Sequence, residues 1–500
     1  MKKREKLIIL VLFLVLLGAA PRQKKDEKKF IRPNVIFIVV DDLGWRDVGF
    51  MGSGFYETPY LDRLARQGII FSNAYSSCAV CSPSRASLLT GRYPVRMGIT
   101  DWIRGSNNGS KIPADGKNPD GYEKEKGAFL KTPVNALWME KEEVTLAEVL
   151  KKEGYSTAHI GKWHLGFDDW FPEKQGFDIN IGGVDFGEPP GYFDPYEAGK
   201  LKIKNLNSRM KGEYLTDREG DEAVNYIRTN KDKPFYLNLW HYAVHTPLQA
   251  KKEMEQKYLN KTKADKTMPD WIAEKDDMNA HFRSREPLNG QRNPTYAAMI
   301  ESIDLAFGRI MKTLEEEGIL NNTIIVFTSD NGGHIVATDN SPAKMGKGHA
   351  SEGGIRVPLA IWFPEQIKPQ SVCETPVMGI DLFPTLLSMT GSKYVPVNKI
   401  DGTDLTPLFK QKGKIKERDL FWHYPHYWWG MKVKPYSIIR SGEWKLIKNY
   451  EDNSLELYNI KEDIGETVNL ASSEKGLVKK LNARFDSWIG SMKGKFPVKE

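Results

Sequence analysis

Cysteine is scarce in this 500-residue chain, which contains three: Cys78, Cys81 and Cys373. Three cysteines in a chain of this length exclude a disulfide framework of the kind that stabilises small secreted domains. A structural zinc site would need a second pair beside Cys78 and Cys81, and only one other cysteine exists. The fold must therefore depend on hydrophobic cores, and Cys78 and Cys81 must be interpreted from the residues around them.

Long apolar runs and a strong charge of one sign are missing as well. The apolar run 7–17 has eleven residues, whereas a membrane-spanning helix needs about 20, so we expect no stable membrane span. Of the formal net charge of +7, residues 1–20 carry +3 and residues 21–29 another +3, which leaves +1 for residues 30–500. A nearly neutral body without a nucleic-acid motif predicts no nucleic-acid partner.

The N-terminus has the pattern of a secretory signal peptide. A basic start, the apolar run 7–17 and Gly18-Ala19-Ala20 predict a signal peptide over residues 1–20, followed by a polar tether over 21–32. Pro21 disfavours cleavage after Ala20, which leaves cleavage after Ala19 or retention as an anchor. Export together with few cysteines predicts a secreted or periplasmic bacterial protein.

The length predicts two folded parts, because a single core rarely extends beyond about 250–300 residues. Residues 33–402 alternate buried strands with helices, which predicts an α/β domain with a large, mostly parallel sheet sandwiched by helices. The strands are expected at 33–40, 156–160, 234–239 and 323–328, and the helices at 59–67, 146–153 and 381–387. Residues 403–500 predict a small α+β subdomain with antiparallel strands at 437–440, 443–448 and 455–459 and a helix at 477–492.

Polar residues collect where the predicted strands end. Those expected there are Asp41, Asp42, Lys162, His164, His245, Asp330 and Asn331. In open α/β sheets, ligands bind at the carboxyl ends of the strands. We therefore expect these side chains to meet in one site.

Four of these residues offer only hard oxygen ligands: Asp41, Asp42, Asp330 and Asn331. Oxygen donors suit Ca²⁺ or Mg²⁺ rather than zinc. Asp and Asn are also common in turns, so each residue alone carries little information. Two such clusters, each following a buried strand, predict a metal site.

Cys81 begins the segment Cys-Ser-Pro-Ser-Arg-Ala-Ser-Leu-Leu-Thr-Gly-Arg. Ser82 and Pro83 predict the cap and first turn of a helix that ends at Gly91. Cys81 would then lie at a helix N-terminus, which favours a bound anion, and Arg85 would return to the same face. The alternatives are a buried structural cysteine, or a redox pair with Cys78 in C-x-x-C spacing.

This segment resembles the signature of the formylglycine-dependent sulfatase family, in particular its arylsulfatase-like, polysaccharide-active bacterial members. The C-x-P-x-R pattern continues into Leu-Leu-Thr-Gly-Arg-Tyr-Pro. Further likeness lies in Lys347 with the Glu-Gly-Gly that follows it, and in Arg440-x-Gly-x-Trp-Lys-Leu. The resemblance covers roughly residues 33–472, and it implies an alkaline-phosphatase-like sheet with a small antiparallel subdomain.

The resemblance also implies cofactors. Cys81 would be oxidised to 3-oxoalanine (formylglycine) by a formylglycine-generating or anaerobic sulfatase-maturating enzyme. One Ca²⁺ would be bound by Asp41, Asp42, Asp330 and Asn331, together with the modified Cys81.

Catalytic roles follow from the same resemblance. Arg85, Lys162 and Lys347 would surround the ester sulfate with positive charge. A hydroxyl of the hydrated Cys81 aldehyde would attack sulfur, and the alcohol would leave with a proton from His245, helped by Lys347. His164 would deprotonate the second hydroxyl, so that sulfate is expelled. Lys344, three residues before Lys347, competes for the same role.

Substrate recognition is expected from long irregular segments and from an aromatic cluster. Segments 101–142, 171–215 and 247–293 show little periodicity and are expected to form the walls of the pocket. Residues 421–429 pack six aromatics around two histidines, at least one of which should face outward to contact a sugar. The candidate substrate-binding residues are Asp101, Arg104, His423, His426 and Arg440.

The sequence therefore predicts a secreted sulfatase that acts on a sulfated mono-, oligo- or polysaccharide. Two alternatives stay open. A phosphonate or phosphate monoester hydrolase could use the same scaffold, because sulfate and phosphate seats differ little. A sulfated-glycan-binding protein that never acquires the aldehyde belongs to a different class, and the full set of acid, base and metal residues argues against it.

Overall fold

The computed structural model of the chain describes residues 32–199, 201–264, 288–410 and 413–499. The predicted signal peptide and the tether up to residue 31 lie outside the described residues, as do residues 265–287 of the predicted wall segment 247–293. Residues 33–500 form one compact unit. The proposed division near residue 402 stays a prediction.

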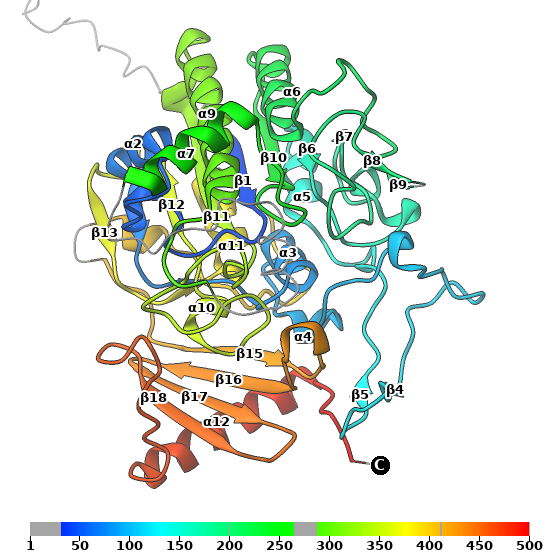
Figure 1. Cartoon of the computed structure of the whole chain (residues 1–500), viewed down its shortest axis with the longest axis vertical. Coiled ribbons are helices and arrows are strands. Elements are labelled where there is room, and N and C mark those ends of the chain that lie inside the picture. Colours follow the sequence, from blue (N-terminus) through cyan, green and yellow to red (C-terminus); the bar gives the residue numbers. More distant parts are fainter. Residues whose placement is uncertain (1–31, 200, 265–287, 411–412, 500) are drawn as a thin grey trace, which may run out of the picture. The chain divides into compact units, whose positions relative to one another are not determined.

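A central eight-stranded sheet organises this unit (Figure 1). Every neighbouring pair is parallel except the two pairs that involve β12, which runs opposite to β11 and β2. The predicted large, mostly parallel sheet is therefore confirmed. In spatial order the strands are β13 (Ser371–Cys373), β2 (Ile69–Phe71), β12 (Leu359–Trp362), β11 (Thr323–Ser329), β1 (Asn34–Val40), β10 (Phe235–His241), β6 (Ser156–Gly161) and β7 (Ile179–Ile181).

Alternation along the fully buried β1 divides the interior into two cores, because successive side chains of a strand point to opposite faces. Ile36, Ile38 and Val40 join the core on the side of helices α2, α6, α7 and α9, and Val35, Phe37 and Val39 join the core on the side of α3, α5 and α11. The first set is α2 (Pro59–Gln67), α6 (Leu215–Asn230), α7 (Lys252–Ala264) and α9 (Pro294–Glu316); the second is α3 (Cys81–Thr90), α5 (Leu146–Lys152) and α11 (Leu382–Met389).

Helix starts largely follow the sequence signals. Thr145 caps α5 in a capping box with Glu148, as its sequence pattern indicates. Helix α3 starts two residues earlier than predicted, because Val80 is its N-cap and Cys81 its first residue. Ser82 was wrongly expected to be the cap; its hydroxyl instead donates to the His164 carbonyl and accepts from the Ile103 N–H, both at 2.9 Å.

Helix α7 is a second difference, since it lies in a segment predicted to be irregular. Its buried side chains, Met254, Tyr258 and Thr262, recur every four residues. One such narrow stripe among charged residues is a weak sequence signal. The helix packs against α9 on the outside of the first core.

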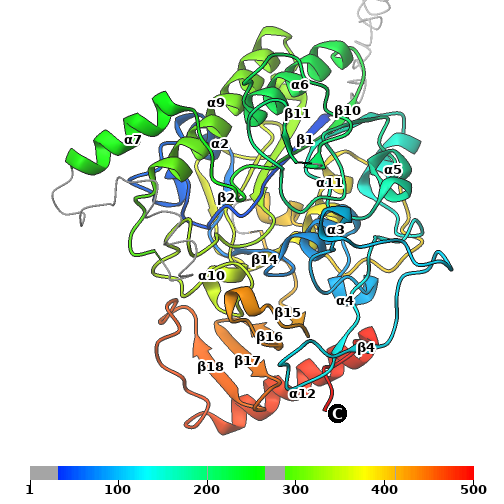
Figure 2. The same ribbon diagram turned by 45° about the vertical axis from the view of Figure 1, so that its right-hand side comes forward.

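A four-stranded antiparallel sheet follows, with α12 (Lys475–Met492) packed against it (Figure 2). Its strands are β15 (Asp419–Tyr424), β16 (Tyr436–Ser441), β17 (Trp444–Asn449) and β18 (Leu455–Asn459). The predicted small antiparallel subdomain is confirmed, with β15 as an additional strand. A third core joins this sheet to the α/β part, for example where Trp422 packs edge-on against Tyr75 and Phe421 against Tyr93.

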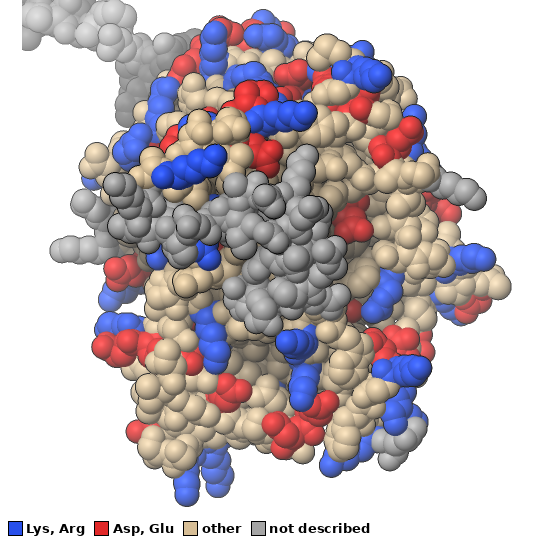
Figure 3. Space-filling model, in the orientation of Figure 1, with Lys and Arg blue, Asp and Glu red and all other residues tan. Residues whose placement is uncertain are grey.

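Short elements complete the described part of the chain. They are β3 (Ala74–Tyr75), β14 (Val377–Met378), β4 (Tyr122–Glu123), β5 (Thr132–Pro133), β8 (Glu197–Ala198), β9 (Leu201–Lys202), α4 (Pro94–Met97), α10 (Glu352–Ile355), η1 (Gly49–Met51), η2 (Ser106–Asn108), η3 (Asp168–Trp170), η4 (Pro172–Lys174), η5 (Leu320–Asn322), η6 (Gly379–Asp381), η7 (Thr406–Phe409) and η8 (Trp429–Met431). Among the described helices, none combines the length and apolar character needed to cross a membrane. On the face shown in Figure 3, acidic and basic side chains are interspersed.

Candidate active site

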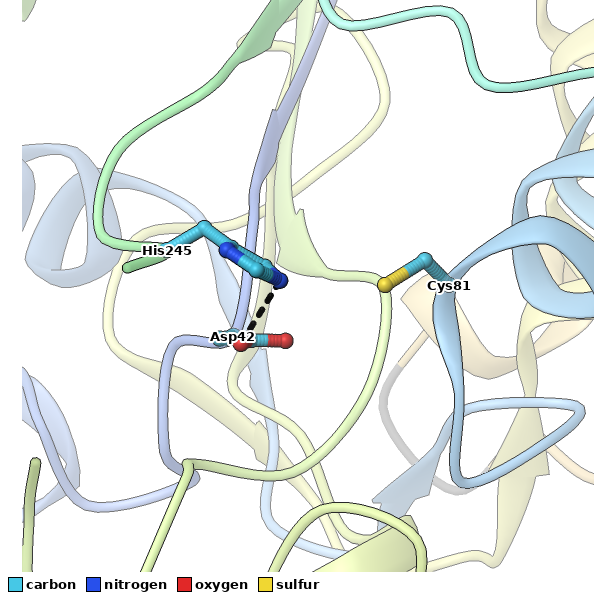
Figure 4. Close-up of side chains that lie close together, drawn as sticks. All are labelled: Asp42, Cys81 and His245. Atoms are coloured by element: carbon cyan, nitrogen blue, oxygen red, sulfur yellow. Dashed lines mark ion pairs between the residues drawn. The ribbon is translucent and has the colours of Figure 1, made fainter. Parts of the chain in front are cut away.

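Four adjacent parallel strands, β11, β1, β10 and β6, deliver the predicted polar residues to one edge of the sheet. Asp41 and Asp42 follow β1, Lys162 and His164 follow β6, His245 follows β10, and Asp330 and Asn331 follow β11. The N-terminus of α3 adds Cys81 and Arg85, and the loop before α10 adds Lys347. In Figure 4 the Cys81 sulfur, the Asp42 carboxylate and the His245 ring point toward one another from three segments. The sequence-predicted catalytic and metal residues therefore gather in one place.

Each cation in the site pairs with a carboxylate. Arg85 Nε donates to Asp330 Oδ2 at 2.8 Å, Lys162 Nζ to Asp41 Oδ2 at 2.6 Å, and Lys347 Nζ to Asp42 Oδ2 at 2.8 Å. The side chains of the first two pairs are 0% exposed. An unpaired buried charge would cost on the order of several kcal/mol, so three acids require three bases here.

The Lys347–Asp42 pair remains charged at neutral pH. Burial raises the pKa of the Asp42 carboxyl, but the Lys347 ammonium and further nearby positive charges hold it well below its usual range. Burial lowers the pKa of Lys347, and the Asp42 carboxylate more than reverses this, so that it lies above its usual range. The Lys347 side chain is therefore a protonated ammonium group in the site.

His245 is neutral, and its hydrogen bonds fix its tautomer. Its Nδ1 lies 2.8 Å from the Thr246 carbonyl, which can only accept, so Nδ1 carries the proton. Its Nε2 therefore accepts from Lys347 Nζ at 2.9 Å. Burial and the neighbouring Lys347 charge lower the pKa of His245 to about 3. The same ring lies 3.6 Å from Asp42 Oδ2.

His164 offers a free basic nitrogen. Its Nε2 donates to the Ile103 carbonyl at 2.7 Å, which leaves Nδ1 as the acceptor. This Nδ1 is buried and has no hydrogen-bond partner among the described residues. Burial and the Lys162 charge lower the pKa of His164 well below its usual value. His164 is thus a neutral ring with one lone pair available.

Asp42 and His164 also share an unusual backbone conformation, with φ of 61° and 60°. A non-glycine residue in this left-handed region costs about 1–3 kcal/mol and persists where the surroundings impose it. Asp42 is held by its ion pair with Lys347, and His164 by its hydrogen bond to the Ile103 carbonyl. Two residues of the site therefore have a strained backbone.

The donor set fits a hard divalent cation. Within the described part of the chain, Asp41 Oδ1 and Asn331 Oδ1 are buried and accept no hydrogen bond. One possible ligand atom from each of Asp41, Cys81 and Asp330 lies within 4.8 Å of the others, and the same holds for Asp42, Cys81 and His245. Buried carboxylate and amide oxygens that accept no hydrogen bond are the kind of ligand that Ca²⁺ or Mg²⁺ prefers.

Cys78 and Cys81 are both free and buried. Burial raises the pKa of each thiol to about 12, so unmodified Cys81 is a neutral thiol at pH 7. A redox pair needs the opposite, a thiol whose pKa is lowered. This environment argues against the redox interpretation of C-x-x-C spacing.

The histidines of the aromatic cluster are not where the sequence suggested. Both His423 and His426 are 4% exposed, so the expectation that at least one faces outward is wrong. His423 bonds Ser437 Oγ at 2.7 Å and the Lys495 carbonyl at 2.9 Å, and His426 Nε2 bonds Thr100 Oγ1 at 2.7 Å. The reason is that His423 lies in β15, an edge strand of the C-terminal sheet, where Phe485 of α12 and Phe496 after it pack on its ring. His426 follows the strand and packs against Tyr424 and Thr100.

The other three substrate candidates differ in exposure. Arg440 is 6% exposed and lies 4.8 Å from the centre of the Tyr75 ring, a packing position between β16 and the α/β part. Asp101 is 1% exposed, accepts from Tyr424 Oη at 2.9 Å, and has its pKa raised by burial to about 6. The Arg104 side chain is 39% exposed, 3.9 Å from Asp101. Arg104 alone of the five retains an accessible polar group.

Two features of the site were missed or left undecided by the sequence. Lys347, not the exposed Lys344, contacts Asp42 and His245. Trp428 borders the site: Lys347 Nζ lies 5.9 Å from its ring centre, and a Cβ at Gly348 would come within 2.8 Å of the ring. Trp428 stood in the predicted aromatic cluster, but only the fold shows that its ring faces Lys347.

Comparison with known proteins identifies the family. The sulfatase family model matches residues 33–392, and the model for the C-terminal part of N-sulphoglucosamine sulphohydrolase matches residues 345–489. The chain belongs to the sulfatase family. It is accordingly a sulfuric ester hydrolase, and the fold is the alkaline-phosphatase-like arrangement expected for that family.

Individual sulfatases are similar over most of the chain. A protein named sulfatase from Formosa agariphila is 31% identical over 98% of this chain and 94% of its own, and N-acetylgalactosamine-6-sulfatase from Mus musculus is 32% identical over 78% and 68%. The structure of Ps i-CgsB, solved with k-i-k-neocarrahexaose, aligns with a TM-score of 0.72 and 30% identity. The alignment covers 91% of this chain and 92% of Ps i-CgsB. A protein solved with its substrate D-glucosamine-2-N,6-O-disulfate aligns with a TM-score of 0.66 and 26% identity. This alignment covers 92% of this chain and 98% of that protein.

Proposed function

We propose that this sulfatase hydrolyses a sulfate ester of a sulfated carbohydrate, with formylglycine derived from Cys81 and one bound Ca²⁺. The observation that carries the proposal is the buried cluster of three carboxylates and three cations around Cys81. Its formal charges cancel, so a dication held by Asp41 Oδ1 and Asn331 Oδ1, which accept no hydrogen bond, would leave an excess of positive charge. That excess suits an ester sulfate.

The carbohydrate part of the proposal draws on the relatives. The two solved structures reported above contain a carrageenan-type oligosaccharide and a sulfated glucosamine, and the mouse relative is named for a sulfated amino sugar. The two matching family models together span the candidate catalytic residues and the C-terminal sheet. A sulfated mono-, oligo- or polysaccharide is therefore the substrate class that we propose.

The chain's own residues supply charge and proton transfer. Once Cys81 is converted to formylglycine, its hydrated form would supply the hydroxyl nucleophile at the N-terminus of α3. Arg85, Lys162 and Lys347 hold the sulfate oxygens. Lys347 Nζ carries a proton and donates a hydrogen bond to His245 Nε2, so the pair can supply one proton to the departing alcohol oxygen, either from Lys347 directly or from His245 after its Nε2 has taken that proton. On the other side, the bare Nδ1 of His164 can accept the hydroxyl proton that leaves as sulfate is released.

Paired esters test the reaction class. The enzyme, expressed with a maturating enzyme, is offered a sulfate ester and a phosphate ester of the same alcohol, followed by a panel of singly sulfated monosaccharides. We expect released sulfate to exceed released phosphate and to depend on the sugar. Faster phosphate release would instead assign the chain's activity to phosphate monoesters.

We also propose that the protein is exported through its N-terminal signal peptide. The support is the basic start and apolar run of residues 1–17. Mass measurement of the mature N-terminus after native expression tests this. An intact Met1 on cytoplasmic protein would contradict it.

A further inference from the structure

A cavity of about 380 Å³ lies beside the candidate active site. Phe186, Pro190 and Pro247 contribute apolar walls, and Asn107, Glu188 and Thr246 contribute polar groups. The volume falls within the range of about 300–1,000 Å³ typical of small-molecule pockets, which are mostly apolar with a few placed polar groups. The cavity is therefore large enough for part of a substrate.

The walls of this cavity touch both catalytic histidines. Thr246 follows His245 and accepts its Nδ1 proton. Gly187, between Phe186 and Glu188, packs so closely on the other histidine that a Cβ there would lie 2.7 Å from His164 Cε1. One ligand could thus extend from this cavity into the sulfate seat, the place where Arg85, Lys162 and Lys347 would bind the ester sulfate.

The two loops that form the rim are fixed to each other. Asp185 Oδ2 accepts from the Ser106 N–H at 2.6 Å, and a Cβ at Gly105 would lie 2.4 Å from the Asp185 carbonyl. The backbone segments that carry Asn107 and Glu188 are therefore fixed next to these contacts. A preformed rim can discriminate between ligands without first being ordered.

Charge distinguishes this cavity from the sulfate seat. Among the lining residues that the structure describes, Glu188 is the one ionisable group, and it is exposed. The sulfate seat holds Arg85, Lys162 and Lys347, whereas the described lining here contains neither lysine nor arginine. A carboxylate accepts hydrogen bonds from sugar hydroxyls and repels a second sulfate.

We propose that this cavity binds the uncharged sugar unit next to the sulfated one, and that Glu188 selects against a sulfate on that unit. The inference rests on the proposed function, since it assumes a saccharide substrate. Phe186 and the prolines face the C–H surface of the ring, while Glu188 and Asn107 hold its hydroxyls. Specificity then comes from one attractive and one repulsive contribution of the same carboxylate.

The test compares two disaccharides that share the sulfated sugar and differ by one sulfate on the neighbouring unit. Wild type is expected to have the higher kcat/KM for the unsulfated neighbour. Glu188→Gln should shrink the ratio of the two kcat/KM values by about tenfold, the effect of losing a hydrogen bond to a charged group, and Glu188→Lys should shrink it further or invert it. Glu253→Gln, at an exposed residue of α7 outside the lining, is the matched control and should keep the wild-type ratio.

A small aryl sulfate serves as the third substrate, because it reports on the sulfate seat without occupying the cavity. A wild-type enzyme that turns over the saccharides with no preference between them overturns the assignment of Glu188 and leaves the proposed function standing. So does a ratio that is unchanged in both Glu188 variants while all three substrates decline together. Turnover of the aryl sulfate with no release from either disaccharide contradicts the carbohydrate proposal itself.

Discussion

At the scale of single residues, every charge in the active site is balanced by a neighbour. Asp330 pairs with Arg85, Asp41 with Lys162 and Asp42 with Lys347, all buried. Removing one partner leaves the other without compensation in a medium of low polarity. Substitutions here should therefore change metal affinity, stability and turnover together, which makes the choice of control variants important.

Cys81→Ala should abolish turnover and leave the fold intact, because the nucleophile is lost while a smaller side chain fits the same space. Cys81→Ser should be nearly as inactive unless the host converts serine. Cys78→Ser is the matched control and should cost little activity. Released sulfate and circular dichroism measure both effects. Retention of most activity in both Cys81 variants would rule out a formylglycine nucleophile.

Asp330→Ala should weaken metal binding and lower activity with it. Chelation of the wild type should inactivate the enzyme, and Ca²⁺ should restore it better than Zn²⁺, because the ligand set consists of oxygens. Metal content by mass spectrometry is measured beside the rate. If the chelator removes the metal and the rate does not change, the proposed metal site is wrong.

Some residues of the candidate site could be predicted from the sequence, and others could not. Asp41, Lys162 and Asp330 were predictable because each follows a buried strand, and parallel strands carry such residues to one edge. Trp428 and Glu188 were not singled out, because their place in the site depends on loops whose course no periodicity fixes. The buried positions of these histidines depend on contacts distant in sequence, with Lys495 for His423 and with Thr100 for His426, and neither contact leaves a local signal.

At the scale of elements, β15 and α12 decide the role of the aromatic cluster. Phe421 stacks on Trp488 of α12 with ring centres 4.5 Å apart, and His423 satisfies both ring nitrogens inside the subdomain. The polar groups of His423 therefore support the fold. Arg104, with its 39% exposed side chain, remains available to a ligand.

His423→Ala should lower the free energy of unfolding by about 1–3 kcal/mol, because Ser437 Oγ and the Lys495 carbonyl each lose a hydrogen bond inside the subdomain. Its effect on kcat/KM should be equal for a saccharide and an aryl sulfate. Arg104→Ala is the contrasting variant: it should leave stability nearly unchanged and affect the saccharide more. Urea unfolding and parallel kinetics measure both. A saccharide-specific loss in His423→Ala, without destabilisation, would restore that residue as a sugar ligand.

At the scale of the whole molecule, the α/β part and the C-terminal sheet share a core and a buried ion network. Lys445 of β17 pairs with Glu352 at the start of α10 at 3.1 Å and with Glu466 at 2.7 Å, and all three side chains are at most 1% exposed. Glu352 follows Lys347 by five residues. The C-terminal sheet thus stabilises the segment that carries Lys347, the lysine to which we assign proton transfer.

A chain ending at residue 402 should therefore not fold into an active enzyme. Truncation would leave Glu352 without Lys445 and would expose the apolar surface around Tyr75 and Tyr93. We expect aggregation or non-cooperative unfolding, measured by size-exclusion chromatography and urea denaturation. A soluble, cooperatively unfolding fragment would instead establish residues 33–402 as an autonomous domain.

The fold class itself was predictable at this scale, because alternating buried strands and helices admit few arrangements. The joint between the two parts was not, since its contacts are long-range: Trp422 Nε1, for example, donates to the Ser76 carbonyl across 346 positions of the chain. Sequence patterns describe each sheet separately. They do not report which faces the two sheets present to each other.

The central claim is that Cys81, once converted to formylglycine, hydrolyses a saccharide sulfate. The most direct test measures two quantities on the same preparations: the fraction of converted Cys81, by mass spectrometry of its peptide, and sulfate released from the preferred sulfated sugar. Preparations made with and without a maturating enzyme provide a range of conversion. We predict that activity rises in proportion to the converted fraction and vanishes with unmodified Cys81. Full activity from unmodified protein, or no sulfate release from fully converted protein, would contradict the account.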